Sequence, residues 1–253
     1  MPRFAANLTM LFTELPMLDR FAAAADAGFE GAEILFPYDI PARDLSRAAI
    51  SAGLEFVLMN TPPPNWAGGP RGFAAEPGRE DRFRSDFDRA LRFAGALRAR
   101  HIHIMAGYAQ GPEAQDSFAR NLAWAAARAP HVSLTIEPLN PKDQPGYFLA
   151  DFGLAAELIA EVGAPNLGLQ FDSYHAHLIT GDAMATWRRH ASIIRHIQIA
   201  SVPGRHEPSG GMIDHQGFFA ALDHSGYKGW VSAEYNPAGL TAQGLGWLPR
   251  RIG

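Results

Sequence analysis

Short apolar runs, rich in β-branched residues, alternate with longer segments of helical periodicity along the whole chain. This alternation predicts repeated strand–helix units on a parallel sheet. The predicted strands end near Leu8, Leu35, Asn60, Met105, Glu137, Asp172, Gln198 and Glu234. Eight such units within 253 residues indicate an α/β fold, a single-domain (β/α)8 barrel of the TIM-barrel type.

The predicted helices differ in strength. The clearest spans residues 80–97, because an apolar residue recurs there at every third or fourth position from Phe83 to Ala94. We expect this stripe to cover the outside of the barrel. The final segment, 240–252, is bounded by proline and has a weak pattern, so the eighth helix is expected to be short or irregular.

No linker or low-complexity tract divides the chain, so residues 1–253 are predicted to form one domain. One connection differs from the rest, because the segment 61–78 is rich in proline and glycine and is too long for a simple turn. Loops of this length in compact domains are often lids or binding loops. We therefore expect a lid over the site, with a surface insertion of no particular role as the alternative.

Composition excludes several classes of protein. The 22 basic residues are outnumbered by 26 acidic ones, so no general basic surface is available to hold a nucleic acid. The absence of cysteine excludes disulfides and thiolate metal sites, and it suits a reducing compartment. No leader-like segment and no apolar run of about 20 residues is present, so we expect a cytoplasmic protein without a membrane span.

The fifth to eighth predicted strands all end on polar residues able to bind a metal: Glu137, Asp172, Gln198 and Glu234. In a barrel the C-terminal ends of the strands ring one mouth, so these residues are expected to converge. Each of the acids alone is equally well explained as a rim residue paired with arginine or lysine. Three carboxylates and an amide at equivalent positions favour a shared site.

Strand alternation extends this site into the barrel, because residues two apart point to the same face. The residues two positions before each strand end are then also inward: Thr135, Gln170, His196 and Ser232. The residues between them, which would face the helices, are apolar: Ile136, Phe171, Ile197 and Ala233. A structural barrel has a branched aliphatic interior. The polar layer therefore predicts a polar cavity below the mouth.

Three carboxylates at one mouth would repel one another and raise one another's pKa unless a cation lies among them. All four candidate ligands offer oxygen, and the chain has no thiolate. Mg²⁺ or Mn²⁺ is therefore favoured over structural zinc.

Candidate substrate contacts lie close to these strand ends in the sequence. His175 follows Asp172 by three residues and suits donation to a hydroxyl or carbonyl oxygen. Arg205, in a loop rich in glycine and proline, suits a bidentate grip on a carboxylate. The alternatives are a rim histidine with its own partner and an exposed loop cation. Glu33, which ends the second strand in Ala-Glu-Ile, is a further inward candidate.

The glycine loops that bind nucleotide phosphates, the GxSxG elbow of serine hydrolases and the HExxH pattern are absent from the sequence. Nucleotide binding and serine-hydrolase chemistry therefore lack their usual motifs.

Taken together, ten short stretches of the sequence resemble the hydroxypyruvate isomerase family within the xylose isomerase-like barrels. The resemblance covers nearly the whole chain and includes Gln-Phe-Asp-Ser-Tyr-His at 170–175 and His-Ile-Gln-Ile-Ala at 196–200. The other matching stretches are 4–12, 35–39, 66–72, 77–80, 136–140, 145–149, 205–208 and 234–237.

The resemblance implies a metal held by Glu137, Asp172, Gln198 and Glu234. It also implies that Glu137 and Glu234 form the acid/base pair. The substrate contacts it suggests are His175 and Arg205, to which we add Glu33 and Arg71, the latter within the matching stretch 66–72. In related keto-sugar epimerases and endonuclease IV-like proteins the third ligand is typically histidine, so Gln198 favours the hydroxypyruvate isomerase branch.

The expected function is a metal-dependent isomerase that interconverts hydroxypyruvate and tartronate semialdehyde, or a similar short 2-oxo acid pair, by proton transfer through an enediolate. The expected partner is thus a small hydroxy or oxo acid, with neither nucleic acid nor membrane, and with a homo-oligomer as an option. The nearest alternative is an epimerase or isomerase of keto sugars or larger oxo acids. A nuclease is disfavoured by the charge and by the lack of histidine clusters. A non-catalytic barrel that binds sugar acids is the alternative from another class.

Overall fold

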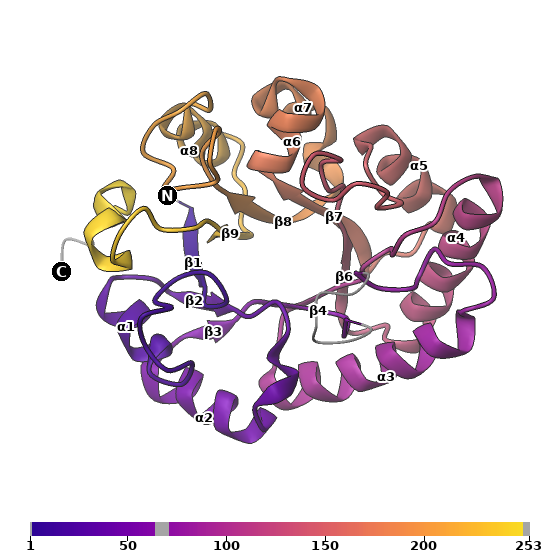
Figure 1. The fold of residues 1–253 in the computed structure, drawn as a ribbon, viewed down its shortest axis with the longest axis horizontal. Helices are drawn as coiled ribbons and strands as arrows, with labels where there is room; N and C mark the ends of the chain where they lie inside the picture. The colour runs from indigo at the N-terminus through magenta and orange to yellow at the C-terminus, as the bar shows by residue number, and fades with distance from the viewer. Residues whose placement is uncertain (1, 64–70, 250–253) are drawn as a thin grey trace.

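The structure, a computed structural model, describes residues 2–63 and 71–249. Its strands are β1 (Arg3–Asn7), β2 (Gly31–Glu33), β3 (Glu55–Phe56), β4 (Leu58–Asn60), β5 (His101–His103), β6 (Ser133–Ile136), β7 (Leu167–Asp172), β8 (Ile194–Ile199) and β9 (Trp230–Ala233). They form one parallel sheet in the order β3-β2-β1-β9-β8-β7-β6-β5-β4, curled into the ring seen in Figure 1.

The ring is completed by the short strands β3 and β4, which flank Val57 and act as one barrel strand. The backbone N–H of Val57 donates to the carbonyl of Ala32 in β2 at 2.7 Å, and its carbonyl accepts from His101 in β5 at 2.9 Å. The segment therefore bonds to both neighbours, and the predicted (β/α)8 barrel is confirmed.

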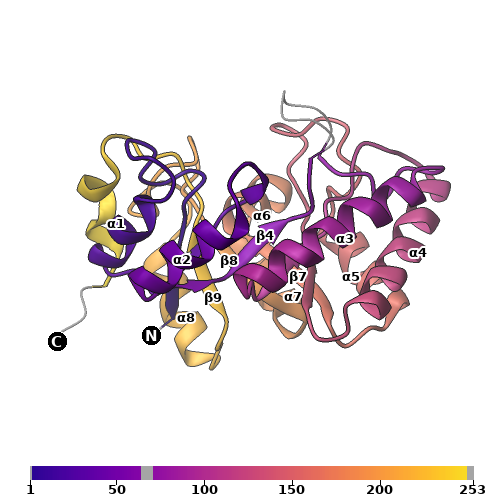
Figure 2. The ribbon, with the colours of Figure 1, turned by 90° about the horizontal axis from the view of Figure 1, so that it is seen from below.

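The helices form the outer layer of the barrel (Figure 1). They are α1 (Arg20–Asp26), α2 (Ala42–Ala52), α3 (Glu80–Leu97), α4 (Pro112–Arg128), α5 (Phe152–Val162), α6 (Ser173–Thr180), α7 (Ala183–His190) and α8 (His215–His224). Short 3₁₀ turns lie at η1 (Pro37–Asp39), η2 (Ala191–Ile193) and η3 (Thr241–Trp247). The helix predicted over 80–97 is α3, and Figure 2 shows it crossing the outside of the ring. The irregular eighth helix is η3, whose two glycines disfavour a regular α-helix.

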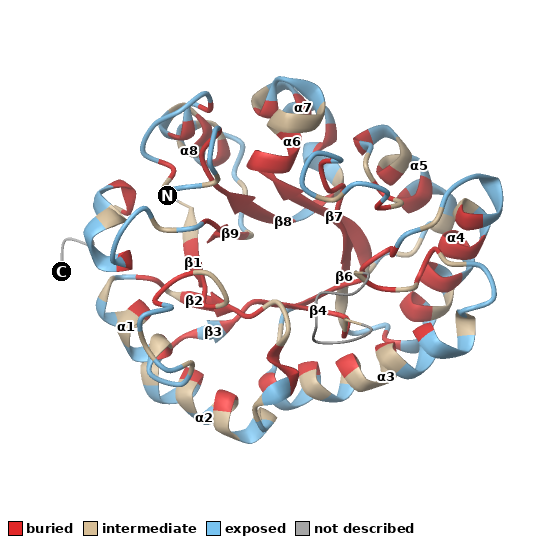
Figure 3. Ribbon diagram, in the orientation of Figure 1, coloured by how far each residue is buried: buried red, intermediate tan, exposed pale blue. Residues whose placement is uncertain are grey.

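The core lies between the strands and the helices, where Figure 3 shows buried residues on the strands and on the inner helix faces. Phe171 on β7 is typical of the predicted outward set. Its ring lies 5.8 Å from that of Phe152 on α5 and 6.0 Å from that of Phe218 on α8. The other outward residues predicted on strands, Ile136, Ile197 and Ala233, are also fully buried.

The inside of the barrel is polar, as the alternation predicts. The buried polar residues there include Asn7, Glu33, His101, His103, Thr135, Gln170, His196, Gln198 and Ser232. Many of these side chains bond to one another, although one ring nitrogen of each histidine, His101 Nε2, His103 Nε2 and His196 Nδ1, has no partner in the described part of the chain. Within the described residues, no helix combines the length and hydropathy that a membrane crossing requires.

The connection after β4 is anchored at the mouth. Gly72 forms an antiparallel bridge with Ala106, just beyond β5. Its φ of +92° and the carbonyl oxygen of Met105, which a Cβ would strike, both require glycine. The bridge fixes the backbone next to Arg71. Residues 64–70 of the predicted lid, 61–78, lie outside the described residues.

Candidate functional site

A cavity of about 380 Å³ opens at the C-terminal ends of the strands. Its lining includes Glu137, Glu234, His175, Arg71 and Arg205. In barrels of this kind the loops at this end carry the chemistry, and the volume suits a small ligand. The cavity is therefore the candidate active site.

A larger hollow of about 1160 Å³ lies between α1, α8 and η3. Its lining includes Phe4, near the start of β1, together with Phe219 and Trp247. None of the predicted site residues lines it. We therefore assign the chemistry to the smaller cavity.

The four predicted ligands reach this end of the barrel from consecutive strands. Glu137 follows β6, Asp172 ends β7, Gln198 lies in β8 and Glu234 follows β9. Asp172 is also the N-cap of α6, because its Oδ1 accepts the backbone N–H of Tyr174 at 2.8 Å. The exposed fraction of all four residues is 6% or less.

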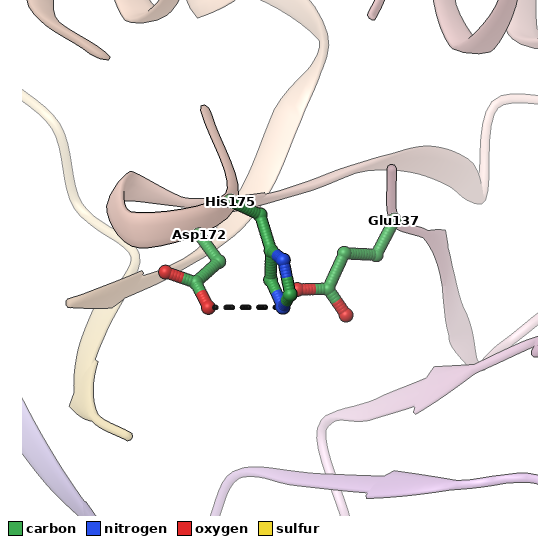
Figure 4. A group of neighbouring side chains, drawn as sticks. All are labelled: Glu137, Asp172 and His175. Carbon is green, nitrogen blue, oxygen red and sulfur yellow. Dashed lines mark ion pairs between the residues drawn. The ribbon is translucent and has the colours of Figure 1, made fainter. Parts of the chain in front are cut away.

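Glu137, Asp172 and His175 point toward one another (Figure 4). One ligand atom from each lies within 4.8 Å of those of the other two, which is close enough for the three to hold one metal ion. His175 Nε2 lies 3.7 Å from Asp172 Oδ2. A cation-binding group is thus present at the predicted place, although it includes His175, which the sequence assigned to substrate.

The tautomer of His175 follows from its contact with Asn140. The backbone N–H of Asn140 donates to Nδ1 of His175 at 3.0 Å, so Nδ1 is an acceptor and carries no proton. Burial, with Arg205 nearby, holds the pKa of His175 well below its ordinary value, so the ring is neutral. Its proton is therefore on Nε2, which makes this atom a hydrogen-bond donor in the site and leaves Glu137 and Asp172 as the members of the group that can bind a cation in this protonation state.

Arg205 links two of the carboxylates. One guanidinium nitrogen, Nη2, lies 3.0 Å from Asp172 Oδ2 and 3.0 Å from Glu234 Oε2. The guanidinium carbon also lies 5.1 Å from the ring centre of Tyr174. The backbone of Arg205 is left-handed, with φ of 55°, and its carbonyl accepts from Asn236 at 2.8 Å. The loop is thus shaped to bring this cation onto the acids.

If all three acids were ionised, they would carry more negative charge than Arg205 balances. Burial raises the pKa of Glu234 to about 8 against the opposing effect of Arg205. Burial, together with Glu234 and Asp172, raises the pKa of Glu137 well above its ordinary value. Oε1 of Glu137 is buried and has no hydrogen-bond partner in the described part of the chain. This donor set fits a divalent cation, which would let all three groups ionise.

Gln198 and Glu33 lie one layer below the cavity. The amide of Gln198 accepts from Gln170 Nε2 at 2.7 Å and donates to Glu33 Oε1 at 2.8 Å. Glu33 also accepts from Asn7 at 2.8 Å and lies 2.8 Å from Nε2 of His196. The carboxylate of Glu33 is thus occupied by protein groups, and its predicted contact with substrate stays a prediction.

Sequence reasoning missed two residues that shape the site. Asn140 fixes His175, and the available signal was its position three residues after Glu137. Gln170 bonds to both Glu137 and Gln198. Strand alternation predicts that Gln170 points inward, but the sequence gives no indication of which groups its amide contacts.

The stability of the protein is expected to depend on pH through these acids. Because the pKa of Glu234 rises from 4.5 to about 8, the folded state binds more protons than the unfolded state between these values. Stability therefore falls as pH rises through this window. Buried histidines, whose pKa values are lowered, oppose this effect below about pH 6.5. We expect the melting temperature of chelator-treated protein to fall from pH 7 to 8, and Mn²⁺ to raise it more at pH 8 than at pH 6. Differential scanning fluorimetry measures both. An equal Mn²⁺ effect at the two pH values would contradict a cation bound to these acids.

Comparisons with known proteins identify the family of this chain. The xylose isomerase-like TIM barrel family matches residues 21–251. A 2-oxo-tetronate isomerase of Cupriavidus necator is 45% identical over 100% of both chains. The hydroxypyruvate isomerase of Escherichia coli is 39% identical over 98% of both chains. A Brucella melitensis crystal structure described as an AP endonuclease of family 2 is 44% identical, with a TM-score of 0.94 over 98% of both chains.

Proposed function

The chain belongs to the xylose isomerase-like TIM barrel family and is an isomerase, and from this premise we propose that it acts on a short 2-oxo acid with a hydroxyl group on carbon 3. Hydroxypyruvate, which would give tartronate semialdehyde, and 2-oxo-tetronate share this unit. Relatives named for each match nearly the full chain. The observation that carries the proposal is a cavity in which two buried glutamates, Glu137 and Glu234, lie beside two arginines, Arg71 and Arg205.

The reaction moves a carbonyl group by one carbon. A carboxylate removes the proton from carbon 3 to give an enediolate, and a carboxyl group returns a proton to carbon 2. The hydroxyl proton passes from the oxygen of carbon 3 to that of carbon 2. Carbon 3 is oxidised and carbon 2 is reduced by the same electron pair, so no other oxidant is needed. We assign the two proton transfers to Glu137 and Glu234, because both line the cavity and burial raises the pKa of both.

His175 has a complementary role. Its Nε2–H faces the site, and the ring is kept neutral by burial. It therefore donates a hydrogen bond to a substrate oxygen as negative charge develops there, and it does not compete for the proton that the glutamates move.

We further propose that Glu137, Asp172, Gln198 and Glu234 hold Mg²⁺ or Mn²⁺. When bound, such a cation supplies Lewis-acid stabilisation of negative charge on neighbouring substrate oxygens. The raised pKa values and the buried Glu137 oxygen without a partner in the described residues support this assignment. The all-oxygen set favours these two ions over zinc.

Proton NMR in D₂O tests the reaction. Hydroxypyruvate and 2-oxo-tetronate are each followed with chelator-treated protein, and then with Mg²⁺ or Mn²⁺ added. We expect the isomeric acid to form, with deuterium on carbon 2, when the cation is present. A free keto sugar is the comparison substrate. Turnover of the sugar with no conversion of either acid would overturn the proposal in favour of a sugar epimerase.

Arg71 is the cation we assign to the substrate carboxylate, in place of Arg205. The guanidinium of Arg205 is already shared between Asp172 and Glu234. Arg71 lines the same cavity, and it forms no ion pair with the described residues. The segment 64–70 before it contains no acidic residue in its sequence.

Arg71→Ala is expected to raise KM for the 2-oxo acid by about 10- to 100-fold, the loss of one charge-assisted contact, with a smaller change in kcat. Arg71→Lys should recover part of the loss, because a lysine keeps the charge without the bidentate geometry. Steady-state kinetics on the acid gives both constants. Arg205→Ala is the comparison and is expected to change kcat more than KM. An unchanged KM in Arg71→Ala would remove Arg71 from this role.

A further inference from the structure

The polar layer below the cavity contains a continuous chain of hydrogen bonds that links residues of four strands, β6, β7, β8 and β2. Thr135 Oγ1 on β6 donates to Gln170 Oε1 at 3.0 Å, and Gln170 Nε2 on β7 donates to Gln198 Oε1 on β8 at 2.7 Å. Gln198 Nε2 then donates to Glu33 Oε1 at 2.8 Å. The chain ends on a buried carboxylate that also bonds to Asn7.

This arrangement fixes the direction of both amides. If the amide of Gln170 were reversed, its oxygen would face the oxygens of Glu137 and Gln198, which are both acceptors. If the amide of Gln198 were reversed, its oxygen would face the carboxylate of Glu33. Each reversal would set buried acceptors against each other, which is costly. One orientation of each side chain is therefore selected without any contribution from a ligand.

Gln170 also controls Glu137. Its Nε2 has two hydrogens, and the second is donated to Glu137 Oε2 at 3.0 Å. One carboxylate oxygen of Glu137 is thus held, and the other, Oε1, is the buried atom without a partner among the described residues. Gln170 itself is 1% exposed and is absent from the cavity lining. It can act on the site through its neighbours and has no route to the substrate.

We propose that Gln170 is a positioning residue, whose single amide nitrogen sets the orientation of both Glu137 and Gln198, so that Glu137 Oε1 and the second lone pair of Gln198 Oε1 remain available to a divalent cation. This inference rests on the proposed function, because it takes these two side chains as ligands. Groups that orient metal ligands typically change metal affinity or activity by 10- to 100-fold. Thr135 supports the same role one step further away, because its hydroxyl selects the direction of the Gln170 amide.

The test replaces the amide while conserving volume. Gln170→Met removes both N–H donors and adds no charge, and it is expected to weaken Mn²⁺ binding by about 10- to 100-fold and to lower kcat by a similar factor, with KM for the 2-oxo acid changed much less. Mn²⁺ affinity is measured without substrate, by electron paramagnetic resonance of the free ion. Thr135→Val keeps the Gln170 donors and loses the hydroxyl, so a smaller loss of affinity is expected. Gln216→Met makes the same chemical change on the exposed face of α8 and is expected to match the wild type.

The outcomes separate the two proposals. Wild-type Mn²⁺ affinity and kcat in both Gln170→Met and Thr135→Val would overturn the positioning role and leave the proposed function intact. A lower melting temperature alone, with unchanged affinity, would likewise reduce Gln170 to a packing role. If Gln170→Met fails to fold, the loss of affinity in Thr135→Val decides the matter. A wild-type protein that binds no Mn²⁺ and converts neither acid would overturn both.

Discussion

Glu234→Gln is expected to lower kcat on the 2-oxo acid by about 10³-fold, because it removes one of the two groups that move protons between carbons 2 and 3. The side chain keeps its size, and the amide oxygen can still accept from Arg205, whose Nη2 lies 3.0 Å from Glu234 Oε2. One buried negative charge is also lost from a crowded group of acids. The variant should therefore fold and show a melting temperature near that of the wild type.

Deuterium exchange gives this prediction a second readout. In D₂O the rate of isotope incorporation reports proton transfer even when product release is slow, so both turnover and exchange should fall in Glu234→Gln. Glu157→Gln, on the exposed face of α5, makes the same change outside the site and should retain full activity. Wild-type exchange in Glu234→Gln would exclude Glu234 from the proton transfer.

Asp172→Asn is expected to cause the second largest loss, a fall in kcat of about 10²- to 10³-fold that accompanies weaker Mn²⁺ binding. Asp172 has two separable roles. Its Oδ1 caps α6, and its Oδ2 carries the charge that meets Arg205. Asparagine is as good an N-cap as aspartate, so the variant should keep its stability, whereas Asp172→Ala should lose about 1 kcal/mol as well as activity.

Asp182 provides the matched control. It caps α7 by accepting the backbone N–H of Ala185 at 2.9 Å, and it lines no part of the candidate active site. Asp182→Asn should leave kcat, Mn²⁺ affinity and stability unchanged. Kinetics, metal titration and thermal unfolding are measured on all three variants. Equal activity in Asp172→Asn and Asp182→Asn would show that the charge of Asp172 has no part in the reaction.

Local sequence patterns predicted the features that depend on local geometry. Successive side chains of a strand point to opposite faces of the sheet. The polar residue Gln170 and the apolar residue Phe171 could therefore be placed on opposite faces of the barrel wall. The helical period of α3 gave its bounds, and the ends of the strands located the four candidate ligands. The roles of those ligands, together with the cytoplasmic location and a homo-oligomer, stay predictions.

Features that depend on tertiary contacts could not be predicted in this way. The pairing of Arg205 with Asp172 and Glu234 depends on a left-handed residue in a long loop, for which residue type gives no indication. The bond from Asn140 to His175 joins two loops after different strands. The second helix after β7 and the interruption of a barrel strand at Val57 also carried no recognised signal.

The ring closes through β1 and β9, which pair with Arg3 opposite Trp230. A chain emerging from the ribosome therefore has two open sheet edges until β9 has been made, and the residues that follow it deliver Glu234 to the mouth. Completion of the barrel and arrival of the last carboxylate are one event during synthesis. A prematurely terminated chain would have neither a closed sheet nor the acid/base pair, and its free edges would expose it to aggregation before any activity could appear.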